Sequence, residues 1–157
     1  MDESLPLAFL ISFRCYGTWL HGDERGSVDR FHNQYGTPML SPNAAQQNQN
    51  HRRLKREPVS LTSEQRDSVV RAICDACVLR KWRLYAVSAR TNHVHAVVSS
   101  ESRPALILNT FKANATRQMR QDGRWRELQT PWSDGGSKRY IWSDPSLKRA
   151  IEYVLNQ

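Results

Sequence analysis

Two histidines placed two residues apart have the clearest chemical potential in this sequence. His93 and His95 lie in the segment NHVHAVV, residues 92–98, which alternates in the manner of a β-strand. Side chains at positions i and i+2 of a strand share a face, with Cβ atoms roughly 6.5 Å apart. Two imidazoles at that separation can converge on one metal ion with bonds of about 2.1 Å. The spacing permits a metal site, but His-x-His also occurs in ordinary strands, and a third ligand has to come from elsewhere.

A tyrosine and an amide near the end of the chain form a second candidate. Tyr153 and Gln157 are one turn apart on a predicted helix that starts at Asp144-Pro145, and they are separated by about 40° around its axis. Both are therefore predicted on one flank of that helix. Its apolar residues recur at helical spacing: Leu147, Ala150, Ile151, Val154 and Leu155. Taken singly, Tyr153 also fits a half-buried aromatic at the core boundary, and Gln157 a solvated helix end.

The elements that must position these residues follow from hydrophobic periodicity and turn signals. The first long helix opens with the capping-box spacing Thr62-Ser63-Glu64-Gln65, and only Arg90-Thr91 separates the two central strands. The predicted order is strand, helix, strand, strand, helix, strand and helix, over residues 5–14, 62–81, 82–89, 92–99, 104–121, 138–142 and from 144 onward.

This order predicts an α+β fold: a ferredoxin-like split βαβ antiparallel sheet with an added C-terminal helix. Both crossover helices of that architecture cover one face of the sheet. Because Val94, Ala96 and Val98 form the apolar side of their strand, we expect that side to pack on the helices. His93 and His95 are then expected on the opposite face, which is left for ligands.

Each crossover helix carries an apolar stripe. A CxxC pair lies in the first stripe, and without a second cysteine pair it indicates core packing rather than zinc. The first stripe comprises Val69, Val70, Ile73, Cys74, Cys77 and Val78. The second helix is expected to point Ile107, Phe111, Ala115 and Met119 inward, with Lys112, Arg117 and Arg120 off that face.

Composition narrows the class of protein. The 157 residues suit one domain, with a long insertion at about residues 21–60 that is rich in Gly, Pro, Asn and Gln. A net charge of +8 and a pI near 9.9 favour a polyanionic partner, although many basic proteins bind no nucleic acid. An acidic start, three cysteines and the lack of a long apolar run indicate a cytoplasmic protein with no membrane partner.

Several segments resemble one enzyme family. The NHVH segment resembles the HUH motif, two histidines around a hydrophobic residue, and Tyr153-x-x-x-Gln157 resembles the nucleophile helix of single-tyrosine HUH transposases. The segments YGTWLHGDERG, residues 16–26, and WSDGG, residues 132–136, resemble the REP-associated tyrosine transposase branch. The resemblance covers roughly residues 5–26 and 82–157, whereas the insertion has no simple counterpart in compact members of the family.

The resemblance implies a mechanism. His93, His95 and Gln157 would bind Mg²⁺ or Mn²⁺, and Tyr153 would be the catalytic nucleophile. Its attack on single-stranded DNA would leave a 5′-phosphotyrosine and a free 3′-OH, and a second 3′-OH could then join strands without ATP. The implied substrate is single-stranded DNA, often a small hairpin from a palindromic repeat, and the implied location is the cytoplasm at the nucleoid.

Basic and aromatic residues supply candidate DNA contacts. Trp125 and Trp132 could stack on unpaired bases, although tryptophans are more often core residues. The candidate DNA-binding residues are Arg14, Lys112, Arg117, Arg120, Arg124, Arg126, Lys138 and Arg139. The sequence leaves open a homodimer in which Tyr153 of one copy acts on DNA held by the other.

Three other interpretations compete with a transposase. A histidine-triad nucleotide hydrolase would need its third histidine at Val97, which disfavours it. A non-catalytic ferredoxin-like module that binds nucleic acid needs only the basic surface and exposed aromatics. An inactive, domesticated transposase would have nearly the same sequence. Covalent adduct formation separates the active enzyme from the last two.

Overall fold

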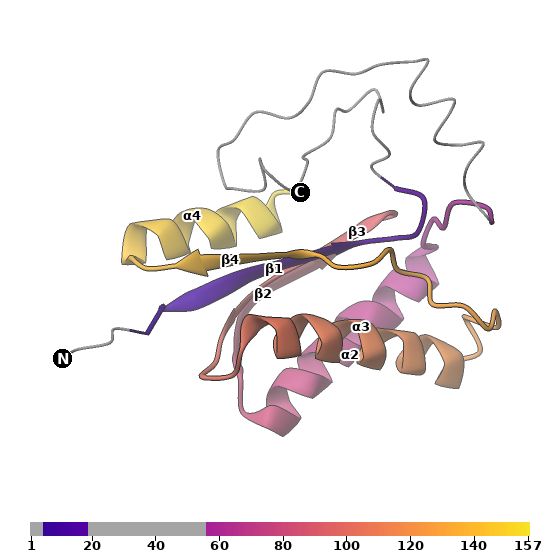
Figure 1. Cartoon of the computed structure of the whole chain (residues 1–157), viewed down its shortest axis with the longest axis horizontal. Helices are drawn as coiled ribbons and strands as arrows, with labels where there is room; N and C mark the ends of the chain where they lie inside the picture. Colours follow the sequence, from indigo (N-terminus) through magenta and orange to yellow (C-terminus); the bar gives the residue numbers. More distant parts are fainter. Residues whose placement is uncertain (1–4, 19–55) are drawn as a thin grey trace, which may run out of the picture.

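A four-stranded antiparallel sheet forms the centre of the protein (Figure 1). The structure is a computed structural model that describes residues 5–18 and 56–157, so the predicted insertion lies almost entirely outside the described residues. The strands run in the spatial order β2-β3-β1-β4. Their bounds are β1 Ala8–Arg14, β2 Arg83–Ala89, β3 His93–Ser99 and β4 Ser137–Ile141.

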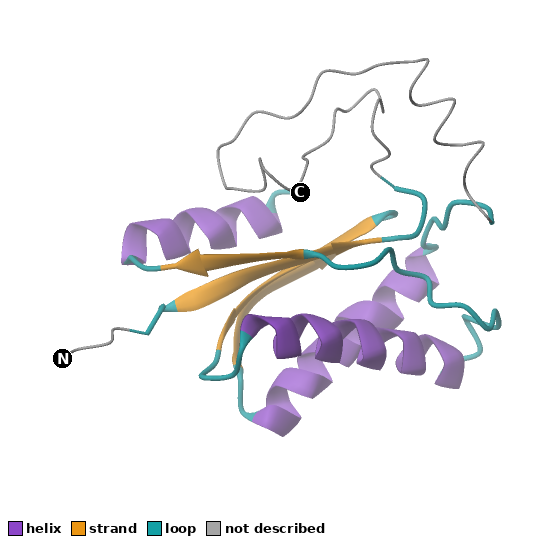
Figure 2. Cartoon of the chain, viewed as in Figure 1, coloured by secondary structure: helices purple, strands orange, loops and turns teal. Residues whose placement is uncertain are grey.

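In the described part of the chain, three helices cover the two faces of the sheet unequally (Figure 2). Helices α2 (Ser63–Arg80) and α3 (Pro104–Gln121) pack on one face, and α4 (Asp144–Leu155) packs on the other. This arrangement confirms the predicted ferredoxin-like α+β fold with an added C-terminal helix. None of the helices in the described residues is long and apolar enough to cross a membrane.

Helix starts follow local hydrogen bonding. The predicted capping box is present, because Thr62 Oγ1 accepts from the Gln65 backbone N–H at 3.1 Å and Gln65 Oε1 accepts from the Thr62 N–H at 2.8 Å. The sequence predicts Asp144 as the cap of the last helix, but the cap of α4 lies one residue earlier. Ser143 caps it by accepting from the Ser146 N–H at 3.3 Å, and Asp144 lies in the first turn.

The β2–β3 connection shows how an unfavourable turn sequence is tolerated. Arg90 donates its backbone N–H to the His93 carbonyl at 2.8 Å, which closes the turn. Backbone N–H groups from two other segments donate to carbonyls of the turn. The Leu61 N–H donates to the Thr91 carbonyl at 2.6 Å, and the Cys15 N–H donates to the Asn92 carbonyl at 2.9 Å. Tertiary hydrogen bonds therefore replace the turn chemistry that Arg-Thr does not supply.

The helix faces are partly as predicted. Ile107, Phe111, Ala115 and Met119 of α3 are all buried in the main core. In α2 the stripe is rotated, so that Val78 is 79% exposed and the prediction for it is wrong. The buried residues of α2 are Ser68, Val69, Ala72, Ile73, Ala76 and Cys77. Small side chains on this face let α2 and α3 pack closely, which the hydrophobic pattern alone does not reveal.

One carboxylate ties the start of α2 to the end of α3. Asp122 accepts hydrogen bonds from Ser68 Oγ at 2.7 Å and Gln118 Nε2 at 3.0 Å, and it forms an ion pair with Arg71. The Ser68 hydrogen bond, followed by the Gln118 bond and the nearby arginines, lowers the pKa of Asp122 below 3.8 despite some opposing desolvation.

We expect Asp122→Asn to lower the melting temperature at pH 7, since it removes the ionised acceptor of these bonds. A lowered native pKa gives stability that is present above the unfolded pKa and is lost as pH falls through the native pKa. The difference from wild type should therefore shrink as pH falls below 3.8. Thermal melts from pH 7 to pH 2.5 measure it. Asp67→Asn, an exposed carboxylate on α2, is the matched control, and equal effects of both variants would contradict the prediction.

Candidate functional site

The two histidines lie on the sheet face that α4 crosses. Val94, Ala96 and Val98 point into the main core beneath α2 and α3, so His93 and His95 point the opposite way, as predicted. Helix α4 covers part of that face. A second apolar cluster joins it to α4, made of Ala8, Leu10, Ala86, Val97, Ile141, Ala150 and Val154.

Helix α4 brings Tyr153 to the histidines. The ring centroids of His93 and His95 are 4.8 Å apart, and those of His95 and Tyr153 are 5.3 Å apart, with the latter pair edge to face at 72°. His95 is 9% exposed and Tyr153 is 39% exposed. A buried imidazole thus contacts a tyrosine whose ring is reachable from solvent, although the two residues are 58 positions apart in sequence.

Two polar residues orient the imidazoles. Ser12 Oγ on β1 lies 2.6 Å from His95 Nδ1, and Asn92 Oδ1 lies 2.7 Å from His93 Nδ1. Because an amide oxygen only accepts, His93 Nδ1 carries the proton and Nε2 carries the ring's lone pair in the neutral form. Such contacts at Nδ1 are the usual way in which proteins fix a metal-binding histidine.

Neither Ser12 nor Asn92 is among the residues that the sequence predicts for the site. Asn92 adjoins His93, so its position beside the motif is a local signal. Ser12 has no such signal, because its role depends on strand register: β1 and β3 are antiparallel, with Ser12 opposite His95 and Arg14 opposite His93. Only the pairing of these strands reveals the contact.

Electrostatics favour a neutral His95. Burial lowers its pKa from 6.5 to about 4, with smaller contributions from the neighbouring His93 and Arg90. The ring therefore carries no charge at neutral pH and can offer a nitrogen lone pair. A neutral imidazole is the form that binds a metal ion.

The position of Gln157 differs from prediction. Helix α4 ends at Leu155, and the N–H of Asn156 closes it by donating to the Glu152 carbonyl at 3.0 Å. Gln157 follows this cap and is exposed, so the prediction that it continues the helical flank of Tyr153 is wrong. Its role as a metal ligand stays a prediction.

The two imidazoles are a partial donor set. Residues 5–18 and 56–157 contain no group of three or more His, Cys, Asp or Glu side chains placed to hold a metal ion. Within the described residues, further ligands to an ion at His93 and His95 would be of other types, such as an amide; water or a phosphate oxygen of the substrate could also serve. Oxygen ligands are the ones that Mg²⁺ and Mn²⁺ favour.

The candidate DNA-binding residues divide between the two sides of the sheet. Arg14 and Arg139 lie on the histidine face, opposite His93 and Leu10 respectively in the strand register. Lys138 alternates to the other face. Lys112 on α3 holds the loop before β4, since its Nζ donates to the carbonyls of Ser133 at 2.8 Å and Gly135 at 2.9 Å. The remaining candidates lie on α3 or just after it: Arg117, Arg120, Arg124 and Arg126.

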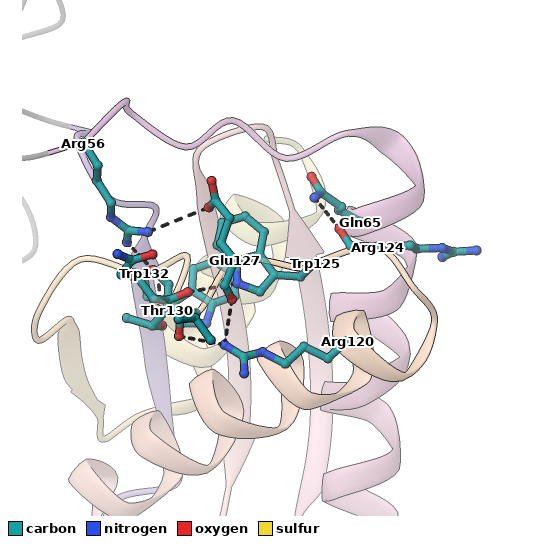
Figure 3. A network of polar contacts seen from close by, with 10 residues as sticks. Arg56, Gln65, Arg120, Arg124, Trp125, Glu127, Thr130 and Trp132 are labelled. Atoms are coloured by element: carbon teal, nitrogen blue, oxygen red, sulfur yellow. Dashed lines mark hydrogen bonds and ion pairs between the residues drawn. The ribbon is translucent and has the colours of Figure 1, made fainter.

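Arg117, Arg120 and Arg124 have hydrogen-bonding partners within the protein, and Arg117 donates to Asn114 Oδ1 at 2.8 Å. Arg120 binds the carbonyls of Glu127 and Leu128, and Arg124 binds the Glu64 carbonyl and Ser68 Oγ. Figure 3 shows the contacts of Arg120, which belong to the hydrogen-bond network that holds the loop after α3. They connect neighbouring segments on the side of the sheet away from His93 and His95.

The sequence leaves two uses open for Trp125 and Trp132, stacking on DNA bases or core packing, and the structure places both rings in the core. They are 8% and 2% exposed, and both belong to the main core. Each indole N–H has a hydrogen-bond acceptor: Trp125 donates to the Gln129 carbonyl at 2.9 Å, and Trp132 donates to Thr116 Oγ1 at 3.0 Å (Figure 3 includes both tryptophans). Because each indole N–H keeps a hydrogen bond, burial of the ring does not incur the desolvation cost of an unpaired donor.

Comparison with known proteins identifies the class of fold. No protein-family model and no curated protein matches the sequence. Two solved structures share the fold. One is a candidate transposase from Deinococcus radiodurans R1, with 10% identity, a TM-score of 0.53, and coverage of 100% of this chain and 95% of that one. The other is a REP-associated tyrosine transposase bound to a REP hairpin, with 11% identity, a TM-score of 0.54, and coverage of 98% and 70%. The chain therefore has the fold of the tyrosine transposases.

Proposed function

We propose that the protein is a transposase-type enzyme that cleaves single-stranded or hairpin DNA and transfers the strand through Tyr153. The observation that carries this proposal is the contact between His95 and Tyr153 beside His93. In this cluster the Tyr153 hydroxyl group, which we propose as the nucleophile, belongs to a ring next to two imidazoles, which we propose as metal ligands. The fold is shared with a tyrosine transposase whose structure was solved with a bound REP hairpin.

In the proposed reaction, the Tyr153 phenolic oxygen attacks a backbone phosphorus atom of the DNA. The bond from phosphorus to the 3′ oxygen breaks, the nucleophile loses its proton, and the 3′ oxygen gains one. The products are a 5′-phosphotyrosine and a free 3′-OH. Attack by another 3′-OH on this ester reverses the chemistry and joins strands, because the ester conserves the phosphodiester linkage.

The donor chemistry fits a divalent ion. His93 and His95 present two neighbouring imidazoles, and the low pKa of His95 keeps its ring neutral. We propose that they hold Mg²⁺ or Mn²⁺, with Gln157 as a further candidate ligand. When bound, the ion supplies polarisation of the phosphate and offsets charge on the leaving oxygen. In support of this proposal, Ser12 and Asn92 each contact Nδ1 of one ring, so Nε2 of each ring is the candidate donor atom.

Covalent trapping tests the proposed function. Incubation with single-stranded hairpin DNA and Mn²⁺ should give a protein–DNA band that survives denaturation, and chelation of the metal should prevent it. Hairpin DNA should also outcompete blunt duplex of the same sequence in binding, and affinity should fall steeply with salt. Tight binding across a panel of palindromic hairpins without any adduct would instead indicate a non-catalytic module or an inactive transposase.

A further inference from the structure

A small hollow opens on the histidine face between β4 and α4. It has a volume of about 110 Å³. Because a water molecule takes about 30 Å³ in the liquid, the hollow suits a compact group such as a phosphate. Its floor and rim comprise Leu10, Ile141, Ala150, Arg139, Ser146 and Arg149.

The charge of this hollow matches an anion. Arg149 on α4 donates from Nη2 to Ser146 Oγ at 3.1 Å, which holds its guanidinium at the rim. Arg139 reaches the same hollow from β4. Among the described residues, every side chain that lines the hollow is neutral or cationic. Two guanidinium groups beside a cavity of this size are the arrangement that binds phosphate oxygens in pairs.

An exposed aromatic pair adjoins the hollow at the sheet edge. Tyr140 and Trp142 are 52% and 56% exposed, with ring centroids 5.9 Å apart. Phe9 supports Tyr140 from behind, edge to face at 5.2 Å. Tyr140 borders the hollow, but its ring lies with Phe9 on the face of the sheet that α2 and α3 cover, whereas Arg139 points to the histidine face, so the two features meet across the edge strand β4. Exposed aromatic rings next to cations are typical of surfaces that bind unpaired bases and their backbone.

The hollow lies along the path to Tyr153. Arg149 and Tyr153 are one turn apart on α4, so they share a flank and are separated by about 6 Å along the axis. On the sheet, Arg139 is two residues along β4 from Ser137, which is opposite Ser12 in the register. Ser12 in turn contacts His95. An extended strand can therefore follow one side of α4 from the hollow to Tyr153.

We propose that this hollow binds one backbone phosphate of single-stranded DNA between Arg139 and Arg149, with a base of the same strand stacked on the Tyr140–Trp142 pair where the strand passes over the edge of β4. It would anchor the strand whose phosphate reaches Tyr153. This inference rests on the proposed function for the identity of the polymer, and it names the part of the surface that holds the uncleaved DNA.

Salt-dependent binding of a short single-stranded oligonucleotide tests the anchor. Arg149→Gln should weaken binding about tenfold, because a charge-assisted contact is lost. It should also reduce the slope of log affinity against log salt by about 0.7, the value for one phosphate contact on a single strand. Trp142→Ala should weaken binding about fivefold or more without changing that slope, because stacking releases no counterions.

Lys148→Gln is the matched control, because it removes the same charge from the adjacent, exposed position of α4. It should leave the slope as in wild type. Equal slopes for Arg149→Gln and Lys148→Gln would overturn the phosphate anchor, and unaltered affinity of Trp142→Ala would overturn the stacked base. Adduct formation is scored separately. If Arg149→Gln reduces the salt slope but the wild-type protein forms no adduct, the proposed catalysis alone is contradicted. If the wild-type protein forms an adduct but Arg149→Gln keeps the wild-type slope, the anchor alone is contradicted. If the wild-type protein does not bind single-stranded DNA, both proposals are contradicted.

Discussion

Tyr153→Phe is expected to reduce the covalent protein–DNA adduct to background. The substitution removes one oxygen and keeps the ring that packs edge to face on His95. Because Tyr153 is 39% exposed, the free energy of unfolding should change by no more than about 0.5 kcal/mol. DNA affinity should stay within a few-fold of wild type, since phosphate contacts elsewhere supply most of it. A denaturing gel with labelled hairpin DNA and Mn²⁺ measures the adduct.

Tyr85→Phe is the matched control for this experiment. Tyr85 is a partly buried tyrosine on β2 that packs against the same apolar cluster as α4, but it lies outside the proposed site. Cleavage should be retained in this variant. Mass spectrometry of the wild-type adduct should place the nucleotide on the peptide that contains Tyr153. A nucleotide on another peptide, or an adduct formed by Tyr153→Phe, would refute the assignment of the nucleophile.

The fold was largely predictable because its signals are local and periodic. The capping box at Thr62, the alternation around His93 and His95, and the Pro and Gly residues between elements each act within a few residues. Strand order followed from the βαββαβ pattern, because that connectivity permits few antiparallel sheets. The expected histidine face was confirmed for the same reason: the two crossover helices can cover only one side of the sheet.

The site was predictable only in part, because its other features depend on tertiary contacts. The contact of Ser12 with His95 requires the β1–β3 register, which no single segment encodes. The burial of Trp132 requires a hydrogen-bond acceptor from α3. The prediction for Gln157 extends the helical periodicity beyond Leu155, but α4 ends at that residue. Helix ends are set by capping and by the packing of neighbours, not by periodicity.

The residues of the insertion, about 21–60, fall mostly outside the described part of the chain, so the prediction of a long insertion there stays a prediction. The same holds for a homodimer. The described residues already contain the candidate nucleophile, both candidate histidine ligands and the proposed anchor.

His95→Ala should abolish Mn²⁺-dependent cleavage while DNA binding stays within a few-fold of wild type. The change removes one of two neighbouring imidazoles and also the ring that contacts Tyr153. Since His95 is buried and hydrogen-bonded to Ser12, we expect a loss of about 1–2 kcal/mol in the free energy of unfolding. Adduct formation, Mn²⁺ affinity of the free protein and hairpin affinity are measured on the same preparation.

Ser12→Ala separates metal binding from ring positioning, because it keeps both imidazoles and deletes only the hydroxyl at His95 Nδ1. Loss of such a partner typically costs tenfold or more in metal affinity or activity, so a slower but detectable adduct is expected, with partial recovery at higher Mn²⁺ concentration. His95→Ala should show no such recovery, since a ligand atom rather than its support is missing. Full cleavage by His95→Ala would exclude this histidine from the catalytic centre, and wild-type Mn²⁺ affinity in that variant would exclude it as a ligand.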